Sequence, residues 1–242
     1  MRLFVCLIYG LLLTWHPVSG QLLEPDEVDK IRIQGATNEY KSHNVANLLS
    51  GKSYALKVPY SINTRFFQDM EPTLGTLVYD DSRLDSIQLL YDVVDQYIII
   101  LQQSFHNQHY IRIDDSKVSQ FSFNGHRFYR IKSDSLLKRG FYEIIYSDEI
   151  YRILAKRVKS KQASVKDNKL QIEFNPTSSY FLQDTTEILE VSGKKKFFKA
   201  LELSEDENRY LRRSNIAFSK RNYELWMKTI LKRLEIYRHK RG

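Results

Sequence analysis

The chain has 242 residues, of which 42% are hydrophobic and 13% aromatic, and its formal net charge is +8. This length and apolar content suffice for the core of one large domain, which excludes an intrinsically disordered protein. The single cysteine is Cys6, near the start of the chain, so disulfides, zinc–thiolate sites and cysteine nucleophiles are excluded from the remainder.

The first twenty residues are typical of a cleavable secretory signal. Arg2 precedes the apolar run 3–13, and residues 18–20 present small or modest side chains where a signal peptidase would cleave. The apolar run is too short to cross a hydrocarbon core of about 30 Å, so a membrane anchor is not expected. We expect cleavage before Gln21, a mature protein outside the cytoplasm and no transmembrane segment after cleavage, because no later segment is long and apolar enough.

Residues 21–193 are predicted to form a β-rich domain. Short runs rich in Tyr, Phe, Ile and Val recur at intervals of roughly 8–12 residues, the spacing of antiparallel meanders in sandwiches and barrels. The runs are Ser53–Val58, Thr76–Tyr79, Ile87–Tyr91, Tyr97–Leu101, Tyr110–Ile113, Val118–Phe123, Arg127–Ile131, Phe141–Tyr146, Tyr151–Val158, Leu170–Phe174, Tyr180–Gln183 and Glu187–Val191.

Turn residues separate these runs. Asn124–Gly125 predicts a two-residue type I′ hairpin turn, because both residues tolerate a positive φ. Asp80–Ser82, Ser147–Asp148 and Asp167–Asn168 mark further turns. Tyr97–Leu101 has no polar alternation, so we expect a strand buried on both faces. The predicted fold is therefore mainly β, an antiparallel meander that is sandwich- or barrel-like, with a C-terminal α-helical hairpin.

Residues 194–242 are predicted to form that hairpin, packed on the β-rich domain. The segment from Ser204 to Glu207 is a capping box, and the helix it starts should end near Arg213. A second helix, capped by Ser219, follows. Its apolar side chains recur at helical spacing, and we expect them to dock on the β-rich domain: Tyr223, Trp226, Met227, Ile230, Leu234 and Tyr237.

Positive charge is concentrated in this tail. From residue 194 onward there are fifteen Lys and Arg against six Asp and Glu, a net of +9, so the preceding residues sum to −1. This segregation indicates an acidic protein or an anionic envelope component as partner, although lysine-rich helix surfaces are also common without one. The residues predicted to form the binding surface are Arg212, Arg213, Lys220, Arg221, Lys228 and Lys232.

Nucleic acid is not an expected partner. The basic face of the tail lacks the interleaved aromatic side chains of a single-strand binder, because the aromatics fall on the apolar stripe. Export would also remove the protein from most nucleic acid. A second basic cluster precedes the tail and consists of Arg152, Lys156, Arg157, Lys159, Lys161, Lys166 and Lys169.

Catalytic and metal-binding signals are weak. His106 and His109, followed by Asp114 and Asp115, are the one local cluster of metal-ligand types, but their spacing matches no closed site and a surface loop is the better interpretation. No Gly-x-Ser-x-Gly elbow or glycine-rich phosphate loop occurs, and acidic residues such as Asp92 are interpreted as turn residues. We therefore expect no metal site, no cofactor and no assignable catalytic residue.

Three segments of the chain resemble features of a known group of proteins. The signal ends directly before Gln21, residues 140–146 lead into residues 152–157, and residues 179–182 precede the basic helices. In these features the chain resembles a group of uncharacterised exported β-rich proteins of that phylum. The resemblance implies the periplasm or outer-membrane surface of a Gram-negative bacterium, or secretion, and it implies no catalytic residues.

The preferred hypothesis is a non-enzymatic cell-envelope protein whose β scaffold carries a basic tail that binds an acidic partner. A second hypothesis is a small-ligand or glycan binder that uses an aromatic-lined face, since sixteen tyrosines offer stacking surface. A third is a hydrolase whose site is assembled in space. An outer-membrane barrel is disfavoured, because most runs are shorter than the roughly 9–11 residues that a spanning strand needs.

Overall fold

A computed structural model describes residues 51–241 apart from 57–60, 104–106 and 133–136. The predicted signal sequence and its cleavage point lie outside the described residues, as do His106 and the end of the first predicted strand. The described chain forms an 11-stranded antiparallel sheet followed by a helical region, so the predicted mainly β fold is confirmed.

The strands follow the predicted runs closely. Their order across the sheet is β1-β5-β4-β3-β2-β6-β7-β8-β9-β10-β11. In chain order they are β1 (Lys52–Ser53), β2 (Thr73–Tyr79), β3 (Ser82–Asp92), β4 (Tyr97–Gln103), β5 (Gln108–Arg112), β6 (Val118–Phe123), β7 (His126–Ile131), β8 (Gly140–Ser147), β9 (Arg152–Lys166), β10 (Lys169–Gln183) and β11 (Ile188–Glu190).

The meander is interrupted twice: β1 pairs with β5 rather than with β2, and a second break follows β5. After β5, the short 3-10 turn η1 (Asp115–Lys117) returns the chain so that β6 pairs with β2. Ile111 and Ile113, near the end of β5, share a buried core with Phe121 and Phe128 of β6 and β7. Side chains from strands that are not neighbours in the sheet thus meet, which requires the sheet to curl around this core.

Three hairpins use two-residue turns in which both residues have positive φ. Asn124 and Gly125 have φ of 49° and 77°, which confirms the predicted turn between β6 and β7. Asp80–Asp81 and Asp167–Asn168 adopt the same left-handed conformation between their strands. This geometry matches the right-handed twist of the flanking strands, and short polar residues and glycine adopt it at low cost.

Strand β4 is buried on both faces, as its lack of alternation predicts. Ile98 and Ile100 enter the main core, whereas Ile99 points to the other face and packs with Phe66 and Leu90. All three isoleucines are almost completely shielded from solvent. The uninterrupted apolar run is therefore explained by two cores rather than one.

Strands β9 and β10 form one long hairpin, although the sequence predicts two separate strands within β10. Polar residues around Pro176 interrupt the apolar pattern there, but the ladder continues through the Pro176–Lys159 pair. The Lys159 amide donates away from β10, to the Val93 carbonyl at 3.3 Å. The pair is therefore not hydrogen-bonded, and the missing N–H of the proline faces the open edge, where it costs no ladder bond.

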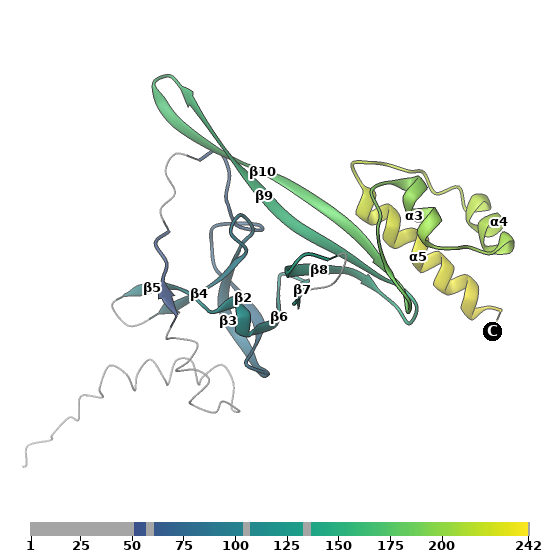
Figure 1. Cartoon of the computed structure of the whole chain (residues 1–242), viewed down its shortest axis with the longest axis horizontal. Helices are drawn as coiled ribbons and strands as arrows, with labels where there is room; N and C mark the ends of the chain where they lie inside the picture. Colours follow the sequence, from purple (N-terminus) through teal and green to yellow (C-terminus); the bar gives the residue numbers. More distant parts are fainter. Residues whose placement is uncertain (1–50, 57–60, 104–106, 133–136, 242) are drawn as a thin grey trace, which may run out of the picture.

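The distal part of this hairpin, residues 160–175, has no strand beside it and is called the arm. Strand β8 pairs only with residues 152–155 of β9, and β11 only with residues 181–183 of β10. Figure 1 shows the hairpin crossing from the helices to a tip that stands away from the other strands.

Residues 61–67 tie the arm to the sheet and are called the strap. The Ile62 amide donates to the Ile172 carbonyl at 2.9 Å. The Asn63 side chain both donates to and accepts from the Phe174 backbone, each at 2.7 Å. At its other end the strap bonds to the end of β3. The strap therefore anchors the base of the arm and leaves its tip without support.

The tail contains helices α3 (Lys194–Ala200), α4 (Glu205–Arg213) and α5 (Tyr223–His239). The predicted capping box is present: the Glu207 amide donates to Ser204 Oγ at 3.3 Å, and the Ser204 amide donates to Glu207 Oε2 at 2.8 Å. The start of α4 lies against the end of α5, because Glu207 pairs with Arg238 and Tyr210 stacks on Tyr237, so the two helices form the predicted helical hairpin. Helix α3 is an additional short element that the sequence did not predict separately.

The helices dock on the end of the sheet that is formed by β8–β10. Trp226, only 4% exposed, shares a core with Ile145, Ile153 and Leu182 of the strands. Met227, Ile230 and Leu234 of the same stripe lie in this core too, whereas Tyr237 stacks on Tyr210 of α4. Among the described helices, none is long and apolar enough to cross a membrane.

Candidate functional site

The two carboxylates of α5 both point toward the sheet. Glu224 accepts hydrogen bonds from Arg157 Nη1 at 2.6 Å and from the Tyr180 hydroxyl at 2.7 Å. Glu235 accepts from the Tyr146 hydroxyl at 2.9 Å. Burial raises the pKa of Glu224, but the bonds from Arg157 and Tyr180 outweigh it, so the pKa lies below its ordinary value. The solvent-facing side of α5 is consequently left without a carboxylate.

Arg157 joins α5 to the sheet through a chain of polar contacts. Its guanidinium binds both Glu224 and the buried carboxylate of Glu143 on β8. Glu143 also contacts His126 Nδ1, and His126 Nε2 lies 3.1 Å from Gln68 Nε2. Desolvation alone would lower the pKa of Arg157, but the two carboxylates raise it above the ordinary value. The guanidinium therefore stays charged and clamps the tail to the sheet.

Two of the three acidic residues in the first turn of α4 are also paired with cations within the tail. Asp206 pairs with Arg209 at 3.3 Å and with Arg241 at 3.0 Å. Glu207 pairs with Arg238 at 2.7 Å. Because these carboxylates are bound to arginines of the tail, they do not offset its other exposed cations.

All six residues of the predicted binding surface are exposed. Arg212 and Arg213 end α4, and Lys228 and Lys232 lie one turn apart on the solvent-facing side of α5. Lys220 and Arg221 directly precede α5, at the other end of the α4–α5 connection from Arg212 and Arg213. The charge of Lys228 helps to lower the pKa of Glu224, so this lysine lies near a carboxylate of its own helix. The structure therefore brings Lys228 and Lys232 together and distributes the other four over two ends of one loop.

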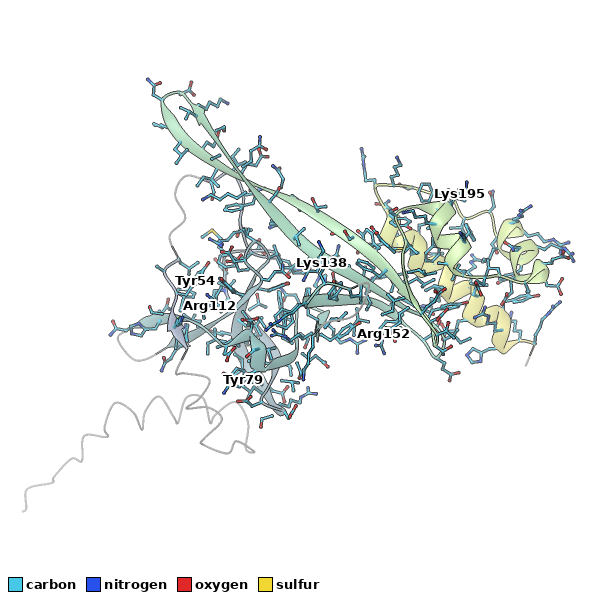
Figure 2. The ribbon with its side chains drawn as sticks, viewed as in Figure 1. Tyr54, Tyr79, Arg112, Lys138, Arg152 and Lys195 are labelled. Atoms are coloured by element: carbon cyan, nitrogen blue, oxygen red, sulfur yellow. The ribbon has the colours of Figure 1, made fainter. Side chains whose placement is uncertain are left out.

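The second basic cluster divides into an inward and an outward group. Lys156 and Arg157 are bound within the fold, and Lys159 Nζ donates to the Thr64 carbonyl of the strap at 2.8 Å. Arg152 is exposed beside the Tyr129 ring. Lys161, Lys166 and Lys169 are exposed on the arm, whose side chains have no other element beside them at the tip (Figure 2). The cluster in the sequence is therefore not one continuous surface.

Among the described residues, Lys156 is held by neutral partners. Its Nζ donates to Gln96 Oε1 at 2.7 Å and to the Phe141 carbonyl at 3.2 Å, and it lies 4.9 Å from the centre of the Tyr142 ring. Burial lowers its pKa to about 8. A Cβ at Gly140 would come within 2.2 Å of this Nζ, so the amine occupies the space that the glycine leaves. These are the contacts of a packed structural side chain.

The histidine and aspartate cluster of the sequence does not converge in the described residues. His109 is exposed on β5. Asp114 accepts from the Ser116 amide at 2.9 Å, and Asp115 pairs with Arg130 at 3.3 Å. No group of three or more His, Asp or Glu residues suited to a metal occurs in the described part of the chain.

Asp92 is more than the turn residue that the sequence predicts. It is fully buried at the end of β3, where it pairs with Arg65 Nε at 2.7 Å and accepts from the Tyr54 hydroxyl at 3.0 Å. It also accepts from the Val94 amide at 3.0 Å, as a turn aspartate does. The carboxylate therefore serves the turn and holds the strap at the same time.

A hollow of about 480 Å³ lies between the β8–β9 turn and the C-terminal part of α5. Asp148 and Ile150 line one side, and Leu234 and Arg238 line the other. Tyr151 is the only aromatic residue in its lining, and it is largely buried. This hollow lacks the aromatic wall on which a sugar ring would stack.

Two exposed apolar residues of α5 were not predicted from the sequence. Leu225 is 63% exposed and Ile236 is 45% exposed, on the same side of the helix as Lys228 and Lys232. Projecting all of α5 at about 100° per residue, rather than its docked stripe alone, would have identified them.

Comparison with known proteins assigns no family. No protein-family model matches the chain, and no curated protein or solved structure matches it either. The resemblance to exported proteins of Bacteroidota therefore stays a prediction, and function is inferred from the geometry of the surface.

Proposed function

We propose that this chain is an exported, non-enzymatic cell-envelope protein whose β scaffold presents the basic helical tail to an acidic protein or anionic envelope component. The signal-like residues 1–20 support export. One observation carries the binding role: Glu224 and Glu235, the only carboxylates of α5, both bond to the sheet. The outward side of the helix is thereby left cationic, which favours an anionic partner.

The attachment of the tail supports the same role. Arg157 binds Glu224 and Glu143 together, and the shared core around Trp226 fixes the orientation of α5. A binding surface on a rigid element loses less conformational entropy on association than one on a mobile segment. The cations of α5 are therefore presented in a fixed arrangement.

The polar contacts of the sheet favour a structural role over a catalytic one. His126 and Glu143 contact each other in the manner of a catalytic pair, but His126 also contacts Gln68 and Glu143 also binds Arg157. A general base needs a reacting group within hydrogen-bond reach. Here the neighbours of both groups are structural partners. His126 and Glu143 therefore belong to the chain of polar contacts through which Arg157 holds the tail on the sheet.

The experiment compares charge reversal on the tail with the same change elsewhere. The variant Lys228→Glu/Lys232→Glu should lose association with envelope extracts in a pull-down. The wild type should lose it as salt rises, because exposed charges farther apart than about 8 Å are largely screened at physiological ionic strength and this distance shortens with more salt. The control Lys161→Glu/Lys166→Glu makes the same charge change on the arm. Each change should alter stability by under about 0.5 kcal/mol.

Intact-mass analysis of the exported protein gives the export half of the proposal its own test, with a chain starting at Gln21 as the expected result. A chain that retains Met1 would overturn export. Equal recovery of partners by the wild type and the α5 variant, at low and high salt, would overturn binding by the tail. Equal loss in the arm control would show that net charge, and not this surface, matters.

A further inference from the structure

Four exposed side chains of α5 share its outward side. At about 100° per residue, Leu225, Lys232 and Ile236 project within about 40° of one another, and Lys228 lies about 60° from Leu225. All four are exposed. We call these four residues the outer stripe. Its composition is one apolar side chain at each end and two lysines between them.

The opposite side of α5 is packed, so the orientation of the stripe is fixed. Met227, Leu231 and Leu234 are almost fully buried in the core shared with the sheet. A single exposed leucine is ordinary on a protein surface. A helix with one face anchored and the other carrying apolar and basic residues, without a carboxylate, has the composition of a helix that lies at a membrane interface.

We propose that the outer stripe seats α5 along the surface of a lipid bilayer rich in anionic headgroups. This inference rests on the proposed function and names the partner of the same surface. Leu225 and Ile236 would enter the boundary between headgroups and acyl chains, and Lys228 and Lys232 would contact lipid phosphates. The helix axis would lie in the plane of the membrane surface.

The shape of the stripe favours a lipid surface over an acidic protein. A stable protein interface takes much of its energy from anchors that enter pockets and buries about 800 Å² on each partner. The outer stripe is one convex helix face, and none of its residues lines the hollow beside Tyr151. A bilayer needs no pocket, because apolar side chains insert between its headgroups.

The test uses vesicles of phosphatidylglycerol and phosphatidylcholine in equal parts, with pure phosphatidylcholine vesicles as the uncharged comparison. Co-sedimentation should show binding to the anionic vesicles that falls as salt rises. Lys228→Gln/Lys232→Gln should weaken the partition coefficient on the order of 25-fold, since each lysine near an anionic surface contributes about fivefold. Leu225→Gln/Ile236→Gln should weaken it by about tenfold or more, because insertion of apolar surface is lost.

Matched controls lie on the arm. Val165→Gln/Leu170→Gln removes another exposed apolar pair, whose members are 73% and 56% exposed and lie directly opposite each other. Lys161→Gln/Lys166→Gln removes two exposed lysines from the same hairpin. Both control variants should bind the anionic vesicles as the wild type does. Every variant has the same N-terminus, so residues before Gly51 contribute equally to all measurements.

Two outcomes overturn the lipid inference and leave the proposed function standing. The first is no binding of the wild type to anionic vesicles at low salt, while the envelope pull-down still depends on Lys228 and Lys232. The second is full binding by Leu225→Gln/Ile236→Gln together with loss by the lysine variant, which indicates charge without insertion. Failure of the pull-down as well would overturn both proposals.

Discussion

Trp226 is held by aromatic rings on several sides. The ring centroids of Phe197, Phe198 and Phe218 lie 5.3, 5.6 and 5.1 Å from its own, all in edge-to-face arrangements. Its indole Nε1 is buried and has no hydrogen-bond acceptor among the described residues. The residue therefore stabilises the tail through packing, and its polar atom contributes no bond there.

Replacing this residue tests whether the tail is docked. Trp226→Ala should lower the free energy of unfolding by about 3–5 kcal/mol, because it leaves a large cavity in the core. Trp226→Phe should cost clearly less, because it keeps an aromatic ring and removes a donor that lacks an acceptor. Urea unfolding followed by circular dichroism measures both. A loss of a few tenths for the alanine variant would show that α5 does not pack on the sheet.

Lys156 gives the protein a pH dependence with a defined sign. Burial lowers its pKa from 10.5 to about 8 in the folded state, so between these values the unfolded chain holds a proton that the folded chain has lost. Stability therefore rises with pH across this window, and the penalty of the buried charge is fully present below it. Partial solvent exposure limits the gain to about 1–2 kcal/mol.

The variant Lys156→Met isolates this contribution. Between about pH 7.5 and about pH 10, the free energy of unfolding of the wild type should rise relative to that of the variant. Tyrosines remote from Lys156, such as Tyr79, whose pKa burial raises, titrate in both proteins and cancel in the difference. A difference that is flat across this range would contradict a buried, desolvated amine.

At the scale of the element, the arm is a two-stranded ribbon beyond the reach of the sheet. Isolated hairpins are marginally stable in water, and the arm exposes its opposed apolar pair Val165 and Leu170. Lys166 and Lys169, like charges directly opposite each other, weaken its tip further. Its backbone bonds should therefore open locally far more often than those at the base of the hairpin.

Hydrogen exchange read by mass spectrometry tests this gradient. Amides of residues 160–171 should exchange quickly, and those of 152–155, which lie between β8 and β10, should be protected. Asn63→Ala removes two bonds to Phe174 and should speed exchange around residues 172–176 without affecting 152–155. Uniform protection along the hairpin would contradict an unsupported arm.

At the scale of the whole molecule, patterns of residue type predicted the strands well. Turn pairs such as Asn124–Gly125 and the continuous apolar run of β4 depend on local backbone and burial preferences, which the sequence displays directly. The return of β6 to β2 was not predictable, because it depends on which distant strands share a core. The same holds for β10, whose Pro176 is tolerated only because that edge of the strand is open.

The candidate surface was predicted only in part. The excess of cations in the tail is visible in composition, and Lys228 and Lys232 fall on the outward side of α5 by helical periodicity. The inward direction of Glu224 depends on Arg157, which is separated from it by 67 residues in the chain. Such pairing is a tertiary property, so the sequence did not show which carboxylates would remain to offset the exposed charge.

The strap has a consequence for the order in which the chain is made. Asn63 bonds to the backbone of Phe174, 111 residues later, so the strap is synthesised long before the strand that satisfies it. The N-terminal half therefore cannot complete its fold until β10 has emerged, since contacts this distant in sequence form late. If the chain is exported as proposed above, this delay would keep the nascent protein unfolded during translocation. Its fold would then be completed only in the destination compartment.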